Sequence, residues 1–166
     1  MSVADSLTAW GLPRAPEIVE LAATAGLALP VAATLLVKES GGRNVWGHDG
    51  VDTGGAYTKG AEVTREDYLA YRVLVRDGRI GRQGVGPTQL TYHVLQDRAD
   101  DRGGCWDWRT NVAVGFEHLA RLQRAVGVRD GFRRYNGSGP AAERYADDAM
   151  TELGRWRDRL GNPPSP

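Results

Sequence analysis

Glu39 is the side chain of this sequence that is best placed to do acid–base chemistry. It ends an apolar run, Val31 to Glu39, which follows Pro30 and stops at Gly41 and Gly42. A proline near the start and glycines directly after the end are typical of a helix. The residues three and four positions before Glu39 are both leucines, so a helix would place the carboxyl group on its apolar face.

Two interpretations of this carboxyl group stay open. The structural one is a side chain that reaches solvent past the helix end or pairs with an arginine. The catalytic one follows from charge, because a helix C-terminus and an apolar surrounding both disfavour the carboxylate and so favour the neutral acid. A neutral carboxyl group can protonate a leaving sugar oxygen, which is the general-acid step of glycosidic cleavage.

Two further segments carry polar side chains in an unusual setting. The segment GRQGVGPTQLTYH holds Gln89 among closely spaced glycines, which allow close approach of a ligand or another backbone segment. The segment FRRYNGSGPAAERYA places Tyr135 and Asn136 before a Gly-Ser-Gly turn, and an aromatic ring beside an amide can hold a sugar ring with its N-acetyl group. The ordinary alternatives are a core aromatic for Tyr135 and a solvated loop residue for Gln89.

Asp49 and Asp52 are the candidates for a second catalytic carboxylate. They follow Glu39 in a loop or hairpin that can fold back over the end of its helix. Hydrolysis with inversion needs such a group to activate water, at about 6.5 to 9.5 Å from the acid, whereas a closer one could act as nucleophile. The alternative is structural, because HDGVDTGG is also good turn chemistry. We favour hydrolysis over transglycosylation because this acidic segment has no other evident purpose.

The elements that must position these residues are mostly helices. Residues 41–63 are rich in glycine, aspartate and threonine, which predicts a long loop that allows a small β-hairpin. Thr64 and Thr91 are predicted helix caps. The predicted fold is mainly α (α+β), a single domain over residues 1–160 with a linker-like tail over 161–166. The predicted helices cover residues 16–27, 31–39, 64–78, 92–99, 108–127 and 139–160.

The composition excludes several classes of partner and site. The chain of 166 residues has 21 basic and 21 acidic side chains, so a net charge near zero offers no basic surface to nucleic acid or to an anionic membrane. The single cysteine, Cys105, excludes an intramolecular disulfide, and the three histidines lack paired ligand spacing, so we expect no metal and no cofactor. No apolar run reaches transmembrane length, and the N-terminus lacks a signal-peptide pattern, which predicts synthesis in the cytoplasm.

The order of three motifs resembles a known superfamily. Glu39-Ser40 at a helix end, the glycine-rich GVGPTQL with Gln89, and Tyr-Asn-Gly at 135–137 followed by a helix with Tyr145 are similar to the soluble lytic transglycosylases and goose-type lysozymes. Within this lysozyme-like superfamily, the segments resemble the muralytic domains of endolysins from phages of actinobacteria. The resemblance spans residues 30–150. The family's usual Gly-Leu-Met-Gln reads Gly86-Pro87-Thr88-Gln89 here, and the interval between Glu39 and Gly84 is longer than is typical.

The resemblance implies a lysozyme-like fold that cleaves peptidoglycan between N-acetylmuramic acid and N-acetylglucosamine. It implies Glu39 as the catalytic acid, with Gln89, Tyr135, Asn136 and Tyr145 lining a cleft for glycan strands. The expected protein is a monomer that acts on the bacterial cell wall, and its tail is compatible with a joint to a further cell-wall-binding module. A lytic transglycosylase, which forms 1,6-anhydro products, is one alternative. A non-catalytic wall-binding or phage tail protein on the same scaffold is another.

A cysteine amidase or peptidase is the remaining hydrolytic alternative. It would need a thiolate beside an imidazole, and His93 and His118 are the histidines nearest to Cys105 in sequence. A lone cysteine next to a tryptophan is more typical of a small buried hydrophobic residue. The arginine-rich segments are interleaved with acidic residues, which favours solvated helix faces over a nucleic-acid surface.

Overall fold

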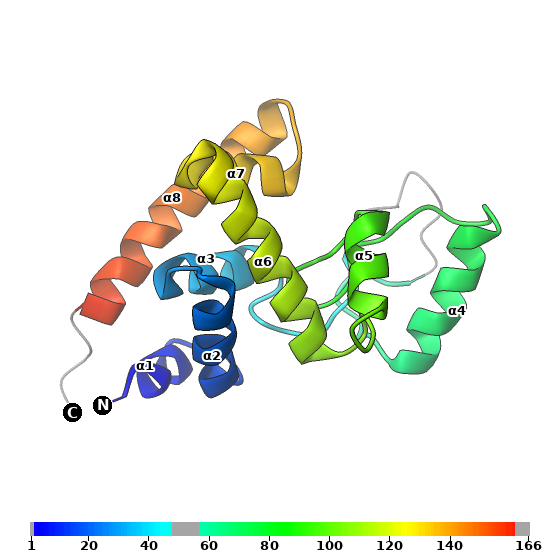
Figure 1. Ribbon diagram of the computed structural model, residues 1–166, viewed down its shortest axis with the longest axis horizontal. Helices are drawn as coiled ribbons and strands as arrows, with labels where there is room; N and C mark the ends of the chain where they lie inside the picture. The colour runs from blue at the N-terminus through cyan, green and yellow to red at the C-terminus, as the bar shows by residue number, and fades with distance from the viewer. Residues whose placement is uncertain (1, 48–56, 162–166) are drawn as a thin grey trace. The chain divides into compact units, whose positions relative to one another are not determined.

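The computed structural model describes residues 2–47 and 57–161. The described part is mainly helical, as predicted, and its β-structure is limited to isolated bridges. The chain divides into two compact units: unit 1 comprises Met1–Gly41 and Phe116–Pro166, and unit 2 comprises Gly42–Gly115. The helices in Figure 1 are α1 (Val3–Ala9), α2 (Ala15–Ala25), α3 (Leu29–Glu39), α4 (Arg65–Arg76), α5 (His93–Asp100), α6 (Trp108–Val126), α7 (Val128–Asn136) and α8 (Pro140–Gly161).

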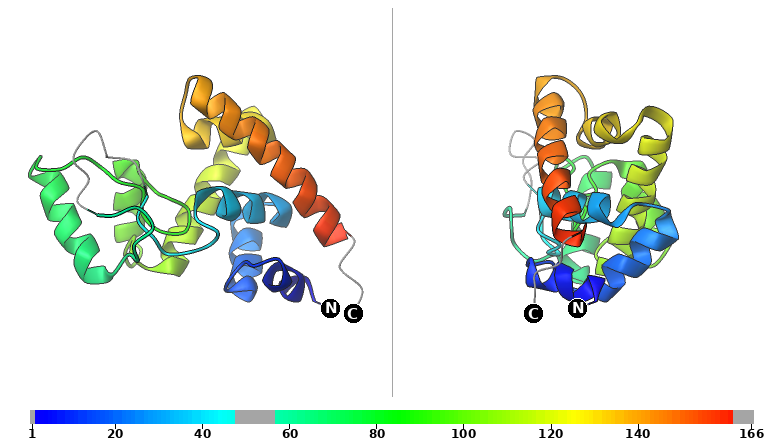
Figure 2. Two further views of the ribbon diagram at one scale, coloured as in Figure 1. Left: turned by 180° about the vertical axis from the view of Figure 1, so that it is seen from behind. Right: turned by 90° about the vertical axis from the view of Figure 1, so that its left-hand side faces the viewer.

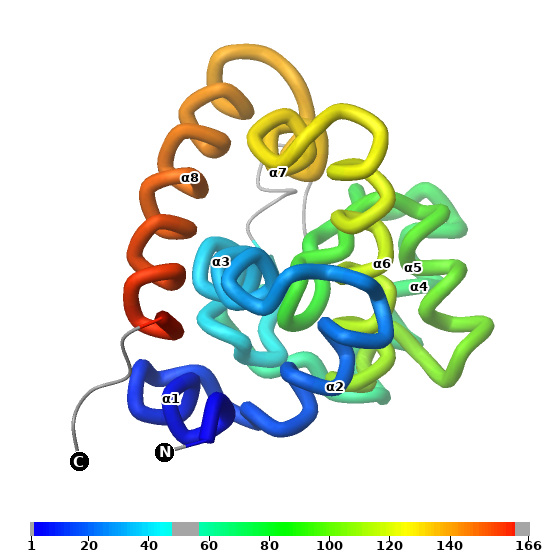
Figure 3. Tube along the Cα trace, turned by 60° about the vertical axis from the view of Figure 1, so that its left-hand side comes forward, coloured from blue at the N-terminus to red at the C-terminus, as the bar shows by residue number. Residues whose placement is uncertain are grey.

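Unit 1 is built from helices that pack around α8. Both α3 and α7 pack along α8, and α2 packs against α1 and α3. Figures 2 and 3 show the light-blue α3 beside the long orange-to-red α8. Leu35 and Leu36 of α3 and Trp156 of α8 are fully buried in this packing. The C-terminal end of α3, which carries Glu39, is therefore held next to α8.

The predicted helix ends of α3 and α4 are confirmed. Pro30 lies in the first turn of α3, where its missing N–H leaves no helical hydrogen bond unmade. The helix stops at the left-handed Gly41 (φ 69°), whose N–H donates to the Leu36 carbonyl at 2.7 Å. Thr64 caps α4 by accepting a hydrogen bond from the Asp67 N–H at 3.1 Å, a contact worth about 1 kcal/mol.

Unit 2 combines α4, α5 and the start of α6 with irregular segments around an aromatic core. Trp46, Tyr68 and Tyr71 are fully buried there. Antiparallel bridges join Val45 to Glu62, Trp46 to Val85 and Val85 to Leu90. The Trp46 N–H donates to the Ala61 carbonyl at 2.9 Å, so among the described residues of the 41–63 interval the hairpin that the sequence allows consists of a short pairing around the bridge between Val45 and Glu62.

The sequence interpretation misses α1 and α7 and errs on one cap. α1 begins with a capping box in which the Ser2 N–H donates to Asp5 Oδ2 at 2.7 Å. α7 begins directly after Gly127, which separates it from α6. Its composition is mostly polar, so the sequence shows no apolar pattern that would predict a further helix after Gly127. The residue before α5 is Tyr92, and the Thr91 hydroxyl donates to the Gln89 carbonyl instead of capping the helix.

No single helix in residues 2–47 and 57–161 is both long and apolar enough to cross a membrane. The pair α2 and α3 reaches that length and composition only together, and it is bent by 118° at its break. The prediction of one domain over residues 1–160 stays a prediction.

Candidate active site

Glu39 and Tyr145 are in direct contact in unit 1. The Tyr145 hydroxyl donates a hydrogen bond to Glu39 Oε1, and the two residues are 106 positions apart in sequence. Glu39 is the last residue of α3 and Tyr145 lies in the second turn of α8, so the packing of these two helices makes the contact. Both side chains are half-buried. The carboxyl group is thus held by a defined donor and keeps access to solvent.

The protonation of this pair follows from its surroundings. Burial, and then the negative charge and hydrogen bond of Glu39, raise the pKa of Tyr145 well above its ordinary value. Tyr145 therefore keeps its proton at neutral pH and acts as a donor to Glu39. Lys38 brings a positive charge close to this pair. Its Nζ lies 4.9 Å from the centre of the Tyr145 ring and 3.6 Å from Asp148 Oδ2.

Tyr135 and His118 continue this cluster of titratable groups within unit 1. Tyr135 is in the last turn of α7 and is buried, and it lies near enough to Tyr145 for the negative charge of its ionised form to raise the pKa of Tyr145. The rings of His118 and Tyr135 have centroids 5.5 Å apart. Arg121 Nη2 lies 3.3 Å from His118 Nδ1, and because a guanidinium can only donate, this nitrogen is the acceptor. Asn136 ends α7 with an exposed side chain.

Gln89 belongs to unit 2, where it completes a tight turn. Val85 and Leu90 exchange two backbone hydrogen bonds across it, and Gln89 has the left-handed φ of 51° that is uncommon for a residue other than glycine. Its Nε2 donates to the carbonyls of Val45 at 2.9 Å and Gly86 at 2.8 Å. One amide hydrogen therefore closes the turn at Gly86 and the other joins it to the Val45 backbone, and a role in sugar binding stays a prediction.

Asn111 is the anchor of this turn, and the sequence interpretation does not single it out. Its Oδ1 accepts from the backbone N–H of Thr88 at 3.1 Å and from the Thr88 hydroxyl at 2.8 Å, and its Nδ2 donates to the Val85 carbonyl at 2.8 Å. A Cβ on Gly86 would lie 2.4 Å from Asn111 Nδ2, so only glycine fits there. The sequence Gly86-Pro87-Thr88-Gln89, which departs from the family pattern, thus has a buried polar partner of its own.

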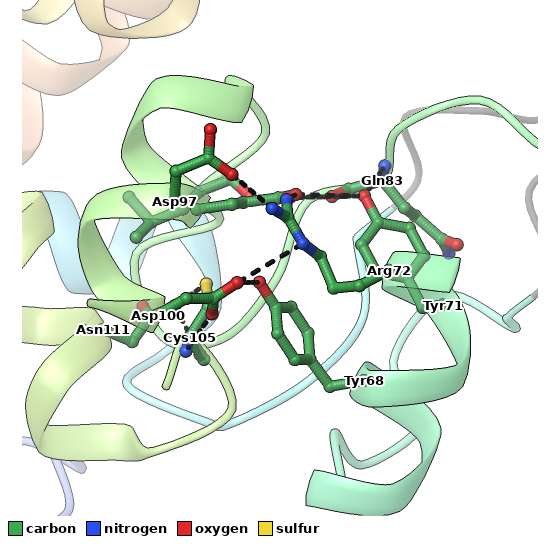
Figure 4. Close-up of polar contacts among 10 residues, drawn as sticks. Tyr68, Tyr71, Arg72, Gln83, Asp97, Asp100, Cys105 and Asn111 are labelled. Carbon is green, nitrogen blue, oxygen red and sulfur yellow. Dashed lines mark hydrogen bonds and ion pairs between the residues drawn. The ribbon is translucent and has the colours of Figure 1, made fainter. Parts of the chain in front are cut away.

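A second polar network in unit 2 joins α4 to α5 (Figure 4). Arg72 of α4 lies between two carboxylates of α5, in contact with Asp97 and at 3.3 Å from Asp100 Oδ2. The Tyr68 hydroxyl donates to Asp100 Oδ2 at 3.1 Å, and Asp100 Oδ1 accepts from the Cys105 N–H at 3.1 Å. Because these side chains pair with one another, their arrangement is that of a structural network.

Cys105 lies at the edge of this network, in surroundings that disfavour its thiolate. It is fully buried, and burial raises the pKa of its thiol to about 12. A thiol with that pKa is protonated at neutral pH, whereas cysteine peptidases need a thiolate. In the described part of the chain, no three histidine, cysteine, aspartate or glutamate side chains are grouped so that they could hold a metal ion.

The structure brings only some of the predicted site residues together. Glu39, Tyr145 and Tyr135 are together in unit 1, and Gln89 is in unit 2. Asp49 and Asp52 lie outside the described residues. Besides Asn111, the sequence interpretation gave no role to Lys38, the neighbour of Glu39, and considered His118 only as a possible partner of Cys105. No local pattern distinguishes these two from ordinary helix residues.

The comparisons with known proteins add no family to this geometry. No protein-family model, curated protein or solved structure matches the chain.

Proposed function

We propose that this chain cleaves the glycan strand of bacterial peptidoglycan with Glu39 as the general acid. The observation that carries the proposal is the contact between the Glu39 carboxyl group, at the C-terminal end of α3, and the hydroxyl of Tyr145. The resemblance of the Glu-Ser, GVGPTQL and Tyr-Asn-Gly segments to lysozyme-like enzymes supports the same role. The substrate would be the bond between N-acetylmuramic acid and N-acetylglucosamine, reached after synthesis of the protein in the cytoplasm.

The proposed reaction begins with proton transfer from Glu39 to the glycosidic oxygen. The bond between that oxygen and the anomeric carbon then breaks, and positive charge develops on the sugar ring. Tyr145 stays protonated, so its hydroxyl fixes the orientation of the Glu39 carboxyl group and stabilises the carboxylate that remains after the transfer. Tyr145 thus acts as a positioning residue through Glu39.

Completion of the reaction by water needs a second carboxylate, and we propose Asp49 or Asp52 for this role. The carboxylate would take a proton from the water molecule whose oxygen attacks the anomeric carbon, giving a product with a free reducing end. If the substrate's own hydroxyl attacks instead, the product is a 1,6-anhydro sugar and no second carboxylate is required. Tyr135 and Asn136 are the proposed contacts to the sugar rings.

Replacement of Glu39 by glutamine tests the proposal. The amide keeps the size of the side chain and cannot donate a proton to the leaving oxygen, so we expect clearing of a purified wall suspension to slow at least about a hundredfold. The exposed Glu66→Gln is the matched control and should clear at the wild-type rate, with unchanged helicity in both variants. Clearing by Glu39→Gln at a near wild-type rate would exclude Glu39 as the acid.

Mass spectra of the soluble products separate the three candidate functions. Reducing ends support hydrolysis, and 1,6-anhydro ends would show a transglycosylase. Retention on the wall without release of any fragment by the wild-type chain would show a non-catalytic wall-binding protein.

A further inference from the structure

A cavity in unit 2 is lined by residues other than those discussed for catalysis. Its volume is about 590 Å³, within the range of about 300 to 1,000 Å³ that is usual for small-molecule sites. α4 supplies most of its lining, α5 contributes His93 and Asp97, and Arg82 comes from the segment between these helices. All of these residues belong to one compact unit, so the cavity is defined within it.

One part of the cavity wall is aliphatic and exposed. Leu69 and Val73 of α4 line it with 45% and 44% of their surfaces exposed, and Val75 lines it as well. Leu69 and Val73 are thus two exposed apolar side chains that line the same cavity, an arrangement typical of a binding site.

The other part of the wall carries positive charge in excess. Arg72 is paired with Asp97 and Asp100, so its charge is already balanced within the protein. Arg76 is 73% exposed and pairs at 3.3 Å with its sequence neighbour Asp77, a contact that contributes little in water. Arg82 is exposed, and the described residues offer it no ion pair. Two guanidinium groups, Arg76 and Arg82, are thus available to an anion beside the aliphatic wall.

We propose that this cavity binds the carboxylate end of a short peptide with a small aliphatic side chain, as at the alanine end of a peptidoglycan stem peptide. A planar carboxylate matches the fork of a guanidinium group, and the adjoining methyl group would pack on Leu69 and Val73. A bare phosphate would satisfy the arginines and leave this apolar surface uncovered. The identification with a wall peptide rests on the proposed function.

The probe for this proposal is diacetyl-Lys-D-Ala-D-Ala, titrated into the full chain and followed by calorimetry. We expect saturable binding that weakens at least about tenfold in Arg82→Gln and for the C-terminal amide of the same peptide, because each change removes one partner of a charge-assisted pair. The matched control is Arg79→Gln, which removes the same charge from an exposed position of unit 2 that does not line the cavity. Its affinity should stay within about twofold of wild type, because an exposed side chain outside the lining makes no direct pair with the bound carboxylate.

Three results would overturn the proposal. They are the absence of binding by the wild-type chain, equal affinities for the acid and the amide, and displacement of the peptide by inorganic phosphate at equal concentration. The probe contains no glycosidic bond, so these titrations can be repeated on Glu39→Gln. Failure of peptide binding would leave the cleavage assay unaffected, and failure of cleavage with intact peptide binding would reject only the proposed role of Glu39.

Discussion

The hydrogen bond between Tyr145 and Glu39 determines what each side chain can do. Burial and the nearby carboxylate keep the phenol protonated at working pH, and its hydroxyl donates to Glu39. Lys38, over the face of the Tyr145 ring, adds an attraction between a cation and an aromatic ring. A half-buried carboxyl group whose orientation is fixed by a donor is held in position for proton transfer.

Replacement of Tyr145 by phenylalanine should slow cleavage about tenfold to a hundredfold and change its pH profile. The phenol stabilises the ionised form of Glu39, so without it the carboxyl group keeps its proton to higher pH. The alkaline limb of the kcat profile should therefore move to higher pH. A loss of activity with an unmoved profile would indicate a purely structural role for Tyr145.

Cys105 should be unreactive in the folded protein. With its pKa raised to about 12, the buried thiol provides almost no thiolate at neutral pH. We expect a disulfide reagent such as dithionitrobenzoate to label it at the rate of unfolding, and at once in denaturant. Rapid labelling under native conditions would contradict this and reopen the cysteine-enzyme alternative.

At the scale of elements, the turn from Gly86 to Gln89 is held by α6. Asn111, in the first turns of that helix, satisfies the polar groups of Thr88, and Thr88 is fully buried. Gly115, one turn further along α6, faces the same threonine, because a Cβ at this position would lie 2.3 Å from Thr88 Oγ1. The turn and the helix therefore pack this closely only with glycine at position 115.

Gly115→Ala should lower the free energy of unfolding by about 1–3 kcal/mol, the usual cost of overpacking a buried site. The matched control is Gly154→Ala in α8, where a Cβ would meet nothing within 4 Å. That change should raise stability by about 0.5–1 kcal/mol, because alanine favours a helix interior over glycine. Denaturant titrations of both variants check the pair, and equal effects of the two changes would contradict the packing argument.

At the scale of the whole molecule, both units bury tyrosines. Burial raises the pKa of Tyr68 and Tyr71 in unit 2 and of Tyr145 in unit 1 above the ordinary value. In the unfolded chain these tyrosines lose their protons near about pH 10. Above that pH the native state binds more protons than the unfolded state, so the free energy of unfolding must fall as pH rises.

Stability should therefore be insensitive to these tyrosines below about pH 10 and decrease steadily above it. Denaturant titrations at a series of pH values measure the slope, and Tyr68→Phe should make it shallower by removing one titrating group. The comparison uses the slope of stability against pH and not stability itself, because Tyr68→Phe also removes the hydrogen bond to Asp100 and so lowers stability at every pH. An unchanged slope in this variant would contradict the assignment of the effect to buried tyrosines.

The sequence by itself determined the helical class and the main helix ends. Pro30, Gly41 and Thr64 act through their own backbone or their nearest neighbours, so their effect can be read locally. It also determined that Glu39 ends a helix. It did not indicate α7, because a mostly polar segment gives no helical pattern and the burial of Phe132 and Tyr135 is set by tertiary packing.

Only the tertiary structure decided which groups meet. Tyr145 reaches Glu39 across 106 residues because α3 and α8 pack together, and Asn111 finds Thr88 because α6 lies beside the turn. The left-handed Gln89, whose amide is turned inward to two backbone carbonyls, also depends on that packing. Such contacts join residues that are distant in sequence, and their energies depend on burial and geometry that no local pattern encodes.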